Sequence, residues 1–180
     1  MTRLALLSLL AATTFSSAFA RPAVSVTPDA QTVIADVNAI NAGVVNLNQN
    51  LEAYQGGVLS QTPIVGDFLE IEVANRKGYA DANLASPFSP SDSTALVNDV
   101  IATVGITIPQ SIQTLKSKKP LFDAAGEDGV IVSTLKVLLY DHDTFSAAVG
   151  AKLTADQGPA AAVVLEIHDA IQSGIDYFSS

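Results

Sequence analysis

The sequence predicts an all-α protein built as an antiparallel bundle of five or six helices. Apolar residues recur at spacings of three and four over several long segments, which is the period of one helix face. Glycine and proline separate these segments, and no alternating run bounded by hairpin turns supports a strand. The chain of 180 residues is 48% hydrophobic but only 6% aromatic. These figures are typical of one domain whose core consists mainly of aliphatic side chains.

The first twenty residues have the pattern of a secretory signal peptide. Arg3 precedes an apolar run from Leu4 to Ala12, and Ala18-Phe19-Ala20 supplies small residues at a cleavage site. A membrane anchor needs about 18–20 consecutive apolar residues, whereas threonines and serines interrupt this run from position 13 onward. We therefore expect a secreted, extracellular protein with a signal peptide over 1–20, a single helical-bundle domain over 21–180, and no transmembrane segment.

Start signals and apolar seams predict the first two helices. Thr27-Pro28-Asp29 is typical of a helix start, and the helix it opens ends at Gly56-Gly57. Its apolar seam has spacings of 4, 3, 4, 3, 4 and 3: Val33, Val37, Ile40, Val44, Leu47, Leu51 and Tyr54. Thr62-Pro63 opens a second helix over roughly 63–84, which places Ile64, Phe68, Ile71, Asn75 and Tyr79 on one face.

The central segments are shorter. Ser89 or Ser91 caps a third helix, whose inward residues are Leu96, Val97, Val100, Ile101 and Val104. The step from Gly105 to Pro109 is expected to break the helical period. A short fourth helix then runs from Pro109 until Pro120 stops it.

Two long helices complete the chain. From Glu127 to Leu153 the apolar residues nearly encircle the helix axis, which predicts a helix in the middle of the bundle. The segment from Thr154 to Pro159 is expected to link this helix to the last one. The seam of the last helix contains Val164, Ile167, Ile171, Ile175 and Phe178. Because the connections are short, neighbours in sequence are expected to be neighbours in space.

Charge and cysteine content exclude several classes of function. Nine basic residues against eighteen acidic ones give a formal charge of −9 and a sequence pI near 4.4. This balance argues against a nucleic-acid partner, because phosphate contacts need clustered Lys and Arg. Loss of Arg3 with the signal peptide would take the charge from −9 to −10. The chain has no cysteine, which rules out disulfides, thiol catalysis and cysteine-based zinc sites.

The sequence contains no catalytic signature. The two histidines, His142 and His168, each lie beside acidic residues in the sequence. Adjacent residues on a helix point about 100° apart, so a histidine and its acidic neighbour cannot converge on one metal ion. The pairs Glu70/Glu72 and Asp141/Asp143 are two residues apart and do not face each other on a helix. An acidic pair could still assemble from distant helices. We expect a non-enzymatic protein with no metal and no cofactor.

Two polar features leave alternatives open. Asn41 and Asn48 run beside the first apolar seam. They are either solvated surface or part of the wall of an internal channel, where amides could hydrogen-bond a ligand head group. The cluster of Lys116, Lys118 and Lys119 is either a solvated helix end or a partner for a carboxylate or an acidic surface.

Several features occur together in this chain: the signal peptide, a cysteine-free helical composition, the string from Val33 to Ile40, and Pro120-Leu121-Phe122 followed by the Val130–Tyr140 helix. With these features, the region from about Thr27 to Phe178 resembles the fungal family of hydrophobic surface-binding protein A and the cell-wall galactomannoproteins. The resemblance implies a bundle around an elongated apolar cavity that holds fatty acids or similar lipids. It also implies adsorption to hydrophobic surfaces and recruitment of a secreted polyester hydrolase. The end at Ser180 shows neither a Ser/Thr-rich stalk nor a lipid-anchor signal, which favours a freely secreted protein over an anchored cell-wall protein.

Three hypotheses remain at this point. The first is a lipid carrier, because a core of small side chains can leave a long void. The second is an amphipathic coat protein that adheres to hydrophobic surfaces from its outside. The third is a structural cell-wall or matrix protein with a fully packed core and no ligand. For the carrier we expect an apolar lining and two head-group amides, Asn41 and Asn48. The lining residues are Val37, Ile40, Val44, Leu47, Phe68, Ile71, Val100, Val104, Leu135, Leu138, Leu139, Phe145, Ile167 and Ile171.

Overall fold

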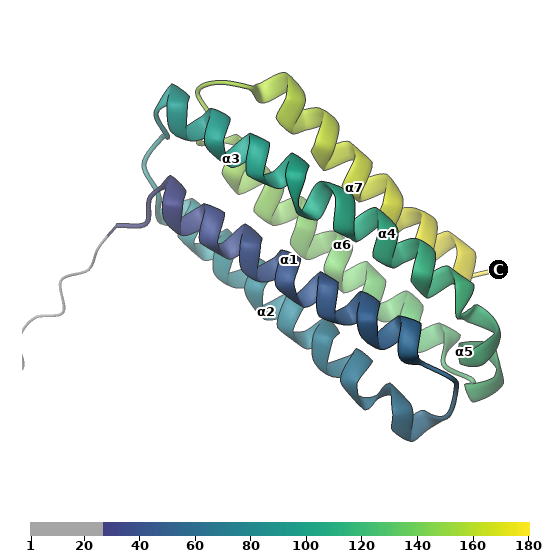
Figure 1. The fold of residues 1–180 in the computed structure, drawn as a ribbon. Helices are drawn as coiled ribbons and strands as arrows, with labels where there is room; N and C mark the ends of the chain where they lie inside the picture. The colour runs from purple at the N-terminus through teal and green to yellow at the C-terminus, as the bar shows by residue number, and fades with distance from the viewer. Residues whose placement is uncertain (1–26) are drawn as a thin grey trace, which may run out of the picture.

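Five long helical rods lie side by side in the computed structural model of this chain (Figure 1). The structure describes residues 27–180, so the predicted signal peptide lies outside the described residues. Within 27–180 every regular element is a helix. The all-α prediction is therefore confirmed.

The rods are formed by seven α-helices and one 3₁₀ turn. Helices α3 and α4 follow each other with a single residue between them and make one rod, and α5 is a short connector at one end of the bundle (Figure 1). The bounds are α1 Ala30–Ala53, η1 Val58–Gln61, α2 Thr62–Leu84, α3 Pro90–Ala102, α4 Val104–Ser117, α5 Lys119–Ala125, α6 Asp128–Gly150 and α7 Gln157–Phe178.

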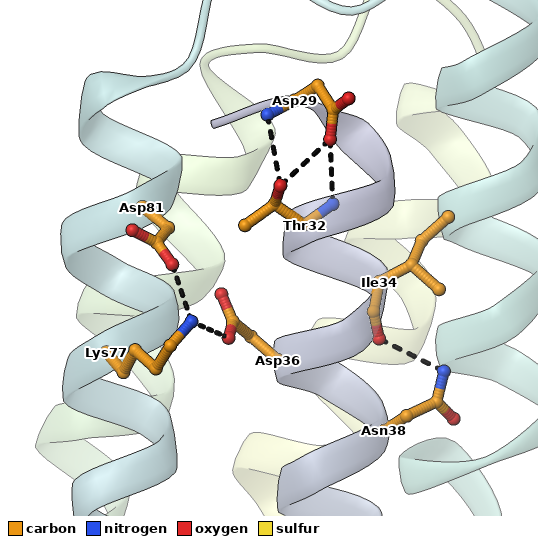
Figure 2. Close-up of polar contacts among 7 residues, drawn as sticks. All are labelled: Asp29, Thr32, Ile34, Asp36, Asn38, Lys77 and Asp81. Atoms are coloured by element: carbon orange, nitrogen blue, oxygen red, sulfur yellow. Dashed lines mark hydrogen bonds and ion pairs between the residues drawn. The ribbon is translucent and has the colours of Figure 1, made fainter. Parts of the chain in front are cut away.

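A reciprocal cap fixes the start of α1. The carboxylate of Asp29 accepts a hydrogen bond from the backbone N–H of Thr32 at 2.9 Å, and the Thr32 hydroxyl faces the backbone N–H of Asp29 (Figure 2). Side-chain caps of this kind satisfy backbone donors that have no partner inside the helix. The helix therefore begins after Asp29 rather than at the Thr27-Pro28 step.

The break between the third and fourth helices differs from the sequence prediction. It falls at Thr103, whose φ of −117° and ψ of −96° are not helical, and α4 has already begun at Val104. Pro109 then lies inside α4. The carbonyl that loses its hydrogen bond there belongs to Gly105, four residues earlier, and a proline at this place bends a helix without having to end it.

Pro120 also acts differently from the prediction. It lies in the first turn of α5, where a proline is favourable because the N–H there has no helical partner. The three lysines that are clustered in the sequence therefore lie in different elements. Lys116 is in the last turn of α4, Lys118 links the two helices, and Lys119 is the first residue of α5. Lys119 forms ion pairs with Asp123 at 3.0 Å and with Asp128 at 3.1 Å.

The five rods close into a ring. Helix α1 packs between α2 and α4, α7 packs between α4 and α6, and α6 packs against α2. The expectation that neighbours in sequence are neighbours in space therefore holds for α1/α2 and α6/α7 but is wrong for α2/α3 and α4/α6. Helix α6 is also a member of the ring wall rather than a central helix, so part of its apolar surface remains exposed.

Charged side chains hold neighbouring rods in register. Lys77 on α2 lies between Asp36 on α1, at 2.5 Å, and Asp81 on its own helix, at 2.7 Å (Figure 2). The Asp36 side chain is buried, and this burial raises its pKa even though the Lys77 ammonium opposes the effect. In the same part of α2, Arg76 contacts Glu72 at 2.8 Å and Asp141 on α6 at 3.3 Å.

One described stretch, Pro90–Ser117, is long and apolar enough to cross a membrane by length and composition. In the structure this stretch is the α3–α4 rod. Asp99 on its surface is within 3.3 Å of the Asn38 amide of α1. The expectation that the chain has no transmembrane segment remains a prediction.

Candidate functional site

The ring of rods encloses a cavity of about 690 Å³. Ligand pockets in proteins commonly have volumes of about 300–1,000 Å³. Most of the lining side chains are Val, Ile, Leu, Phe and Ala, and all five rods contribute to it. A void of this size with so few polar groups is suited to an apolar occupant.

The structure brings together thirteen of the fourteen residues predicted to line a cavity. All except Leu139 are in its wall. Leu139 is half-buried outside the cavity because it lies one residue, or about 100° of helix rotation, beyond Leu138, which faces inward. The remaining wall extends the same seams through Leu96, Val97, Ile108, Ile112, Leu115, Val149, Leu153, Val163 and Val164. These residues follow the predicted positions at helical spacing, so the periodicity could have found them.

The two predicted head-group amides are not in the cavity wall. Asn41 accepts a hydrogen bond of 2.8 Å from the Thr107 hydroxyl and so joins α1 to α4. Asn48 donates to Glu52 on its own helix at 2.7 Å. The structure thus places both amides outside the lining of the cavity, on the sides of α1 next to it.

Ser111 is the polar residue that the sequence prediction missed. It lines the cavity on α4 and is only 4% exposed, and its hydroxyl has no hydrogen-bond partner. A buried hydroxyl without a partner costs about 1–3 kcal/mol, so a polar group on a ligand would be favourable beside it. A signal was present in the sequence, because Ser111 interrupts the apolar face formed by Ile108, Ile112 and Leu115.

The solvent exposure of the lining residues indicates that the cavity opens between α6 and α7. Its solvent-exposed lining residues all lie on these two helices, close to the loop that joins them: Asp143, Ala147, Gly150, Gln157 and Ala161. Ala147 and Gly150 on α6 and Ala161 on α7 place small side chains on both sides of this opening. Ser111 lies in the other half of the bundle, because its neighbour Ile112 packs against Gly174 near the end of α7.

Two histidines lie near this mouth in different electrostatic settings. The His142 ring is buried in the wall, with Nε2 at 3.2 Å from the carbonyl oxygen of Val164, and its burial lowers its pKa. The imidazole is therefore neutral at pH 7. The more exposed His168 is hydrogen-bonded through Nδ1 to the Asp143 carboxylate at 2.9 Å, and this contact raises the pKa of His168.

Glycines allow the rods to approach closely around the cavity. A Cβ placed on Gly43 would stand 2.9 Å from Cγ1 of Ile71, and one on Gly105 would stand 2.8 Å from Cγ2 of Val163. Such separations are too short for any side chain to be added without displacing its neighbour. Aliphatic residues can therefore complete the wall while the centre remains unfilled.

The polar groups of the cavity wall are few and uncharged or acidic. Within 27–180, no group of three or more metal-ligating side chains gathers, and the lining contains neither Lys nor Arg. The wall does bring Asn75, Ser111, His142, Asp143, Ser146 and Gln157 into an otherwise apolar surface. These groups can hydrogen-bond the polar end of a ligand whose remainder is hydrocarbon.

A closed ring of helices around an apolar cavity with a lateral mouth defines a helical domain of the small-ligand-binding class. The chain belongs to the hydrophobic surface binding protein A family, whose model matches residues 30–151. Comparison with curated proteins finds no match.

Solved structures share this architecture. The crystal structure of Afmp4p in complex with palmitic acid is 28% identical, with a TM-score of 0.80, and the match covers 83% of this chain and 99% of that one. Ligand binding domain 2 of the Penicillium marneffei MP1 protein, complexed with multiple arachidonic acids, is 26% identical, with a TM-score of 0.75. This match covers 83% of this chain and 94% of that one. Ligand binding domain 1 of that protein, complexed with arachidonic acids, is 23% identical, with a TM-score of 0.78. The match covers 84% of this chain and 99% of that one, and at this identity it shows the fold alone.

Proposed function

We propose that this protein binds fatty acids or similar lipids in the cavity between its five rods, without catalysing a reaction on them. The observation that carries the proposal is the apolar cavity of about 690 Å³ with a mouth between α6 and α7. Two neighbours above 25% identity that are complexed with fatty acids support it. The third hypothesis, a fully packed core, does not agree with a void of this size.

The physical basis of binding is the transfer of hydrocarbon from water. Each buried methylene contributes about 0.8 kcal/mol, so a long acyl chain binds well with few polar contacts. The unpartnered hydroxyl of Ser111 supplies one hydrogen bond to the polar end of the lipid. The aliphatic seams of α1, α4 and α7 then surround the hydrocarbon.

Thermal unfolding with added lipid tests this proposal. A ligand that binds only the folded state raises the melting temperature as its concentration increases. The delipidated protein is titrated with palmitic acid, and a rise that saturates supports the proposal. No rise with palmitic acid, arachidonic acid or an uncharged long-chain alcohol would overturn it.

The finer parts of the proposal concern location and partners. The chain is secreted after removal of residues 1–20, is extracellular or associated with the cell wall, and has no transmembrane segment. It adsorbs to hydrophobic surfaces, as the family description indicates for its relatives, and there recruits a secreted polyester hydrolase. The signal-peptide pattern supports secretion, and the family description supports adsorption. N-terminal sequencing of the secreted protein, together with co-adsorption of a polyester hydrolase to coated and bare beads, tests them.

A further inference from the structure

An apolar strip runs along the outer face of α2 and α6. Helix α2 presents Val65, Leu69 and Val73 at intervals of four residues, with 49%, 55% and 68% of their surfaces exposed. Helix α6 presents Val130 and Val137, at 53% and 39% exposed. Val65, Leu69, Val130 and Val137 border the same recess between the two helices, which Glu72 and Glu127 also line, so the rows are adjacent. We call these five residues the α2–α6 strip.

The strip explains a feature of the sequence that the cavity does not. The segment that forms α6 is apolar on nearly all sides, although one side of this helix faces solvent in the ring. Exposed apolar residues are ordinary when scattered, but a contiguous group indicates a contact surface. Five large apolar side chains along two neighbouring helices form such a group.

We propose that the α2–α6 strip is the surface through which this protein adsorbs to an uncharged hydrophobic surface, such as a wax or a polyester. The inference rests on the adsorption included in the proposed function and assigns it to a site outside the cavity. The side chains of the strip project outward, and the recess between the two rows is only about 250 Å³, against 690 Å³ for the cavity. Projecting side chains suit a flat or yielding partner better than a helix that must insert its own side chains into a groove.

Charge also favours an uncharged surface over a second copy of the chain. Two copies, each with a formal charge of −10 once Arg3 is removed with the signal peptide, repel each other, whereas a wax or polyester surface carries no opposing charge. Arg76, three residues beyond Val73, contacts both Glu72 and Asp141. Because this cation is already paired, the approach of an apolar surface at that end of the strip does not remove water from an isolated charge.

Adsorption of matched variants to alkyl-coated beads tests the assignment. The strip variant carries Leu69→Gln, Val73→Gln and Val137→Gln. The control variant carries Ile101→Gln, Ile106→Gln and Leu165→Gln, which are 41%, 51% and 59% exposed on other helices. Far-UV circular dichroism and the palmitic acid melting shift are measured for every variant, because the cavity lining is unchanged in both.

The inference predicts that the strip variant adsorbs about tenfold more weakly at equal bead area, while the control variant adsorbs as the unmodified protein does. Adsorption should persist in high salt, because apolar contact is not screened. Equal adsorption by the strip variant and the unmodified protein would overturn the assignment but leave adsorption itself standing. Equal loss in both variants would also overturn it. If the unmodified protein does not adsorb, both the adsorption and its assignment are wrong, whereas lipid binding is judged separately by the melting shift.

Discussion

The Phe145 ring on α6 packs directly onto the backbone of Gly78 on α2. A Cβ added at position 78 would stand 2.6 Å from Cζ of Phe145. The same ring lines the cavity, so this contact joins two rods and also sets the position of part of the cavity wall. The absence of a side chain at residue 78 thus determines how far the ring is held away from the cavity centre.

Replacing Gly78 with alanine should therefore destabilise the protein although alanine favours helices. Overpacking at this contact costs about 1–3 kcal/mol, which exceeds the gain of about 0.5–1 kcal/mol from helix propensity. The control is Gly66→Ala on the same helix, where nothing lies within 4 Å of the new Cβ, and this variant should be more stable. Urea unfolding measures both changes. Equal stabilisation by the two substitutions would show that the Gly78–Phe145 contact does not constrain the fold.

Entry through the mouth is tested with a pair of adjacent alanines. Ala161 is exposed and lines the opening, whereas Ala162 is exposed but is not part of the lining. Ala161→Phe places a ring across the opening and should slow lipid association about tenfold, since the ring must move before the lipid enters. Ala162→Phe should leave the rate unchanged. Stopped-flow binding of a fluorescent fatty acid gives both rates, and equal rates would place the entrance elsewhere.

Ser111→Ala should change stability and binding in opposite directions. Without lipid the variant loses a buried hydroxyl that has no partner, so unfolding should require about 1 kcal/mol more free energy. With palmitic acid the variant loses one hydrogen bond, which corresponds to about a fivefold to tenfold weaker affinity. The affinity for hexadecane, which has no polar end, should not fall. Unchanged palmitic acid affinity would remove Ser111 from the ligand site.

His142 should make the folded state less stable as the pH falls. Burial lowers the pKa of this imidazole in the folded protein below its ordinary value of 6.5, whereas the hydrogen bond to Val164 and the charge of Asp143 oppose the shift. The unfolded chain therefore takes up the proton first, so the stability is present above pH 6.5 and is lost as the pH falls through the folded pKa.

The His142→Gln variant isolates this effect, because His168, whose pKa is raised and whose contribution has the opposite sign, is present in both proteins. The difference in unfolding free energy between the original protein and the variant should shrink from about pH 8 to about pH 5. Urea unfolding at several pH values measures it. A difference that grows toward the acidic end of this range would mean that the folded state protonates His142 readily.

The sequence predicted the helices because their apolar seams have a clear period. The seam from Val33 to Tyr54 is buried, and its middle part, from Val37 to Leu47, lies in the cavity wall. The order of the rods around the ring could not be derived, because connections such as the one from α2 to α3 allow more than one placement. The helix boundaries were also hard to predict. The start of α1 depends on the cap formed by Asp29 and Thr32, and Pro109 lies inside α4 without ending it.

The polar part of the site was harder to predict. Asn41 and Asn48 lie close to the seam in sequence, but one helical step of rotation turns them toward Thr107 and Glu52 instead of the cavity. Ser111 is distinctive only once its burial and its missing partner are known. Whether aliphatic side chains close a core depends on distances between helices, which the pattern of apolar residues does not contain.

Native mass spectrometry of the purified protein, before and after delipidation, measures the occupancy of the cavity directly. Lipid binding predicts mass increments that match fatty acids or similar lipids, disappear on delipidation and return when palmitic acid is added. Ala161→Phe should delay their return, and Ala162→Phe should not. A single mass equal to that of the bare chain under all of these conditions, with no change on addition of lipid, would contradict lipid binding in the cavity.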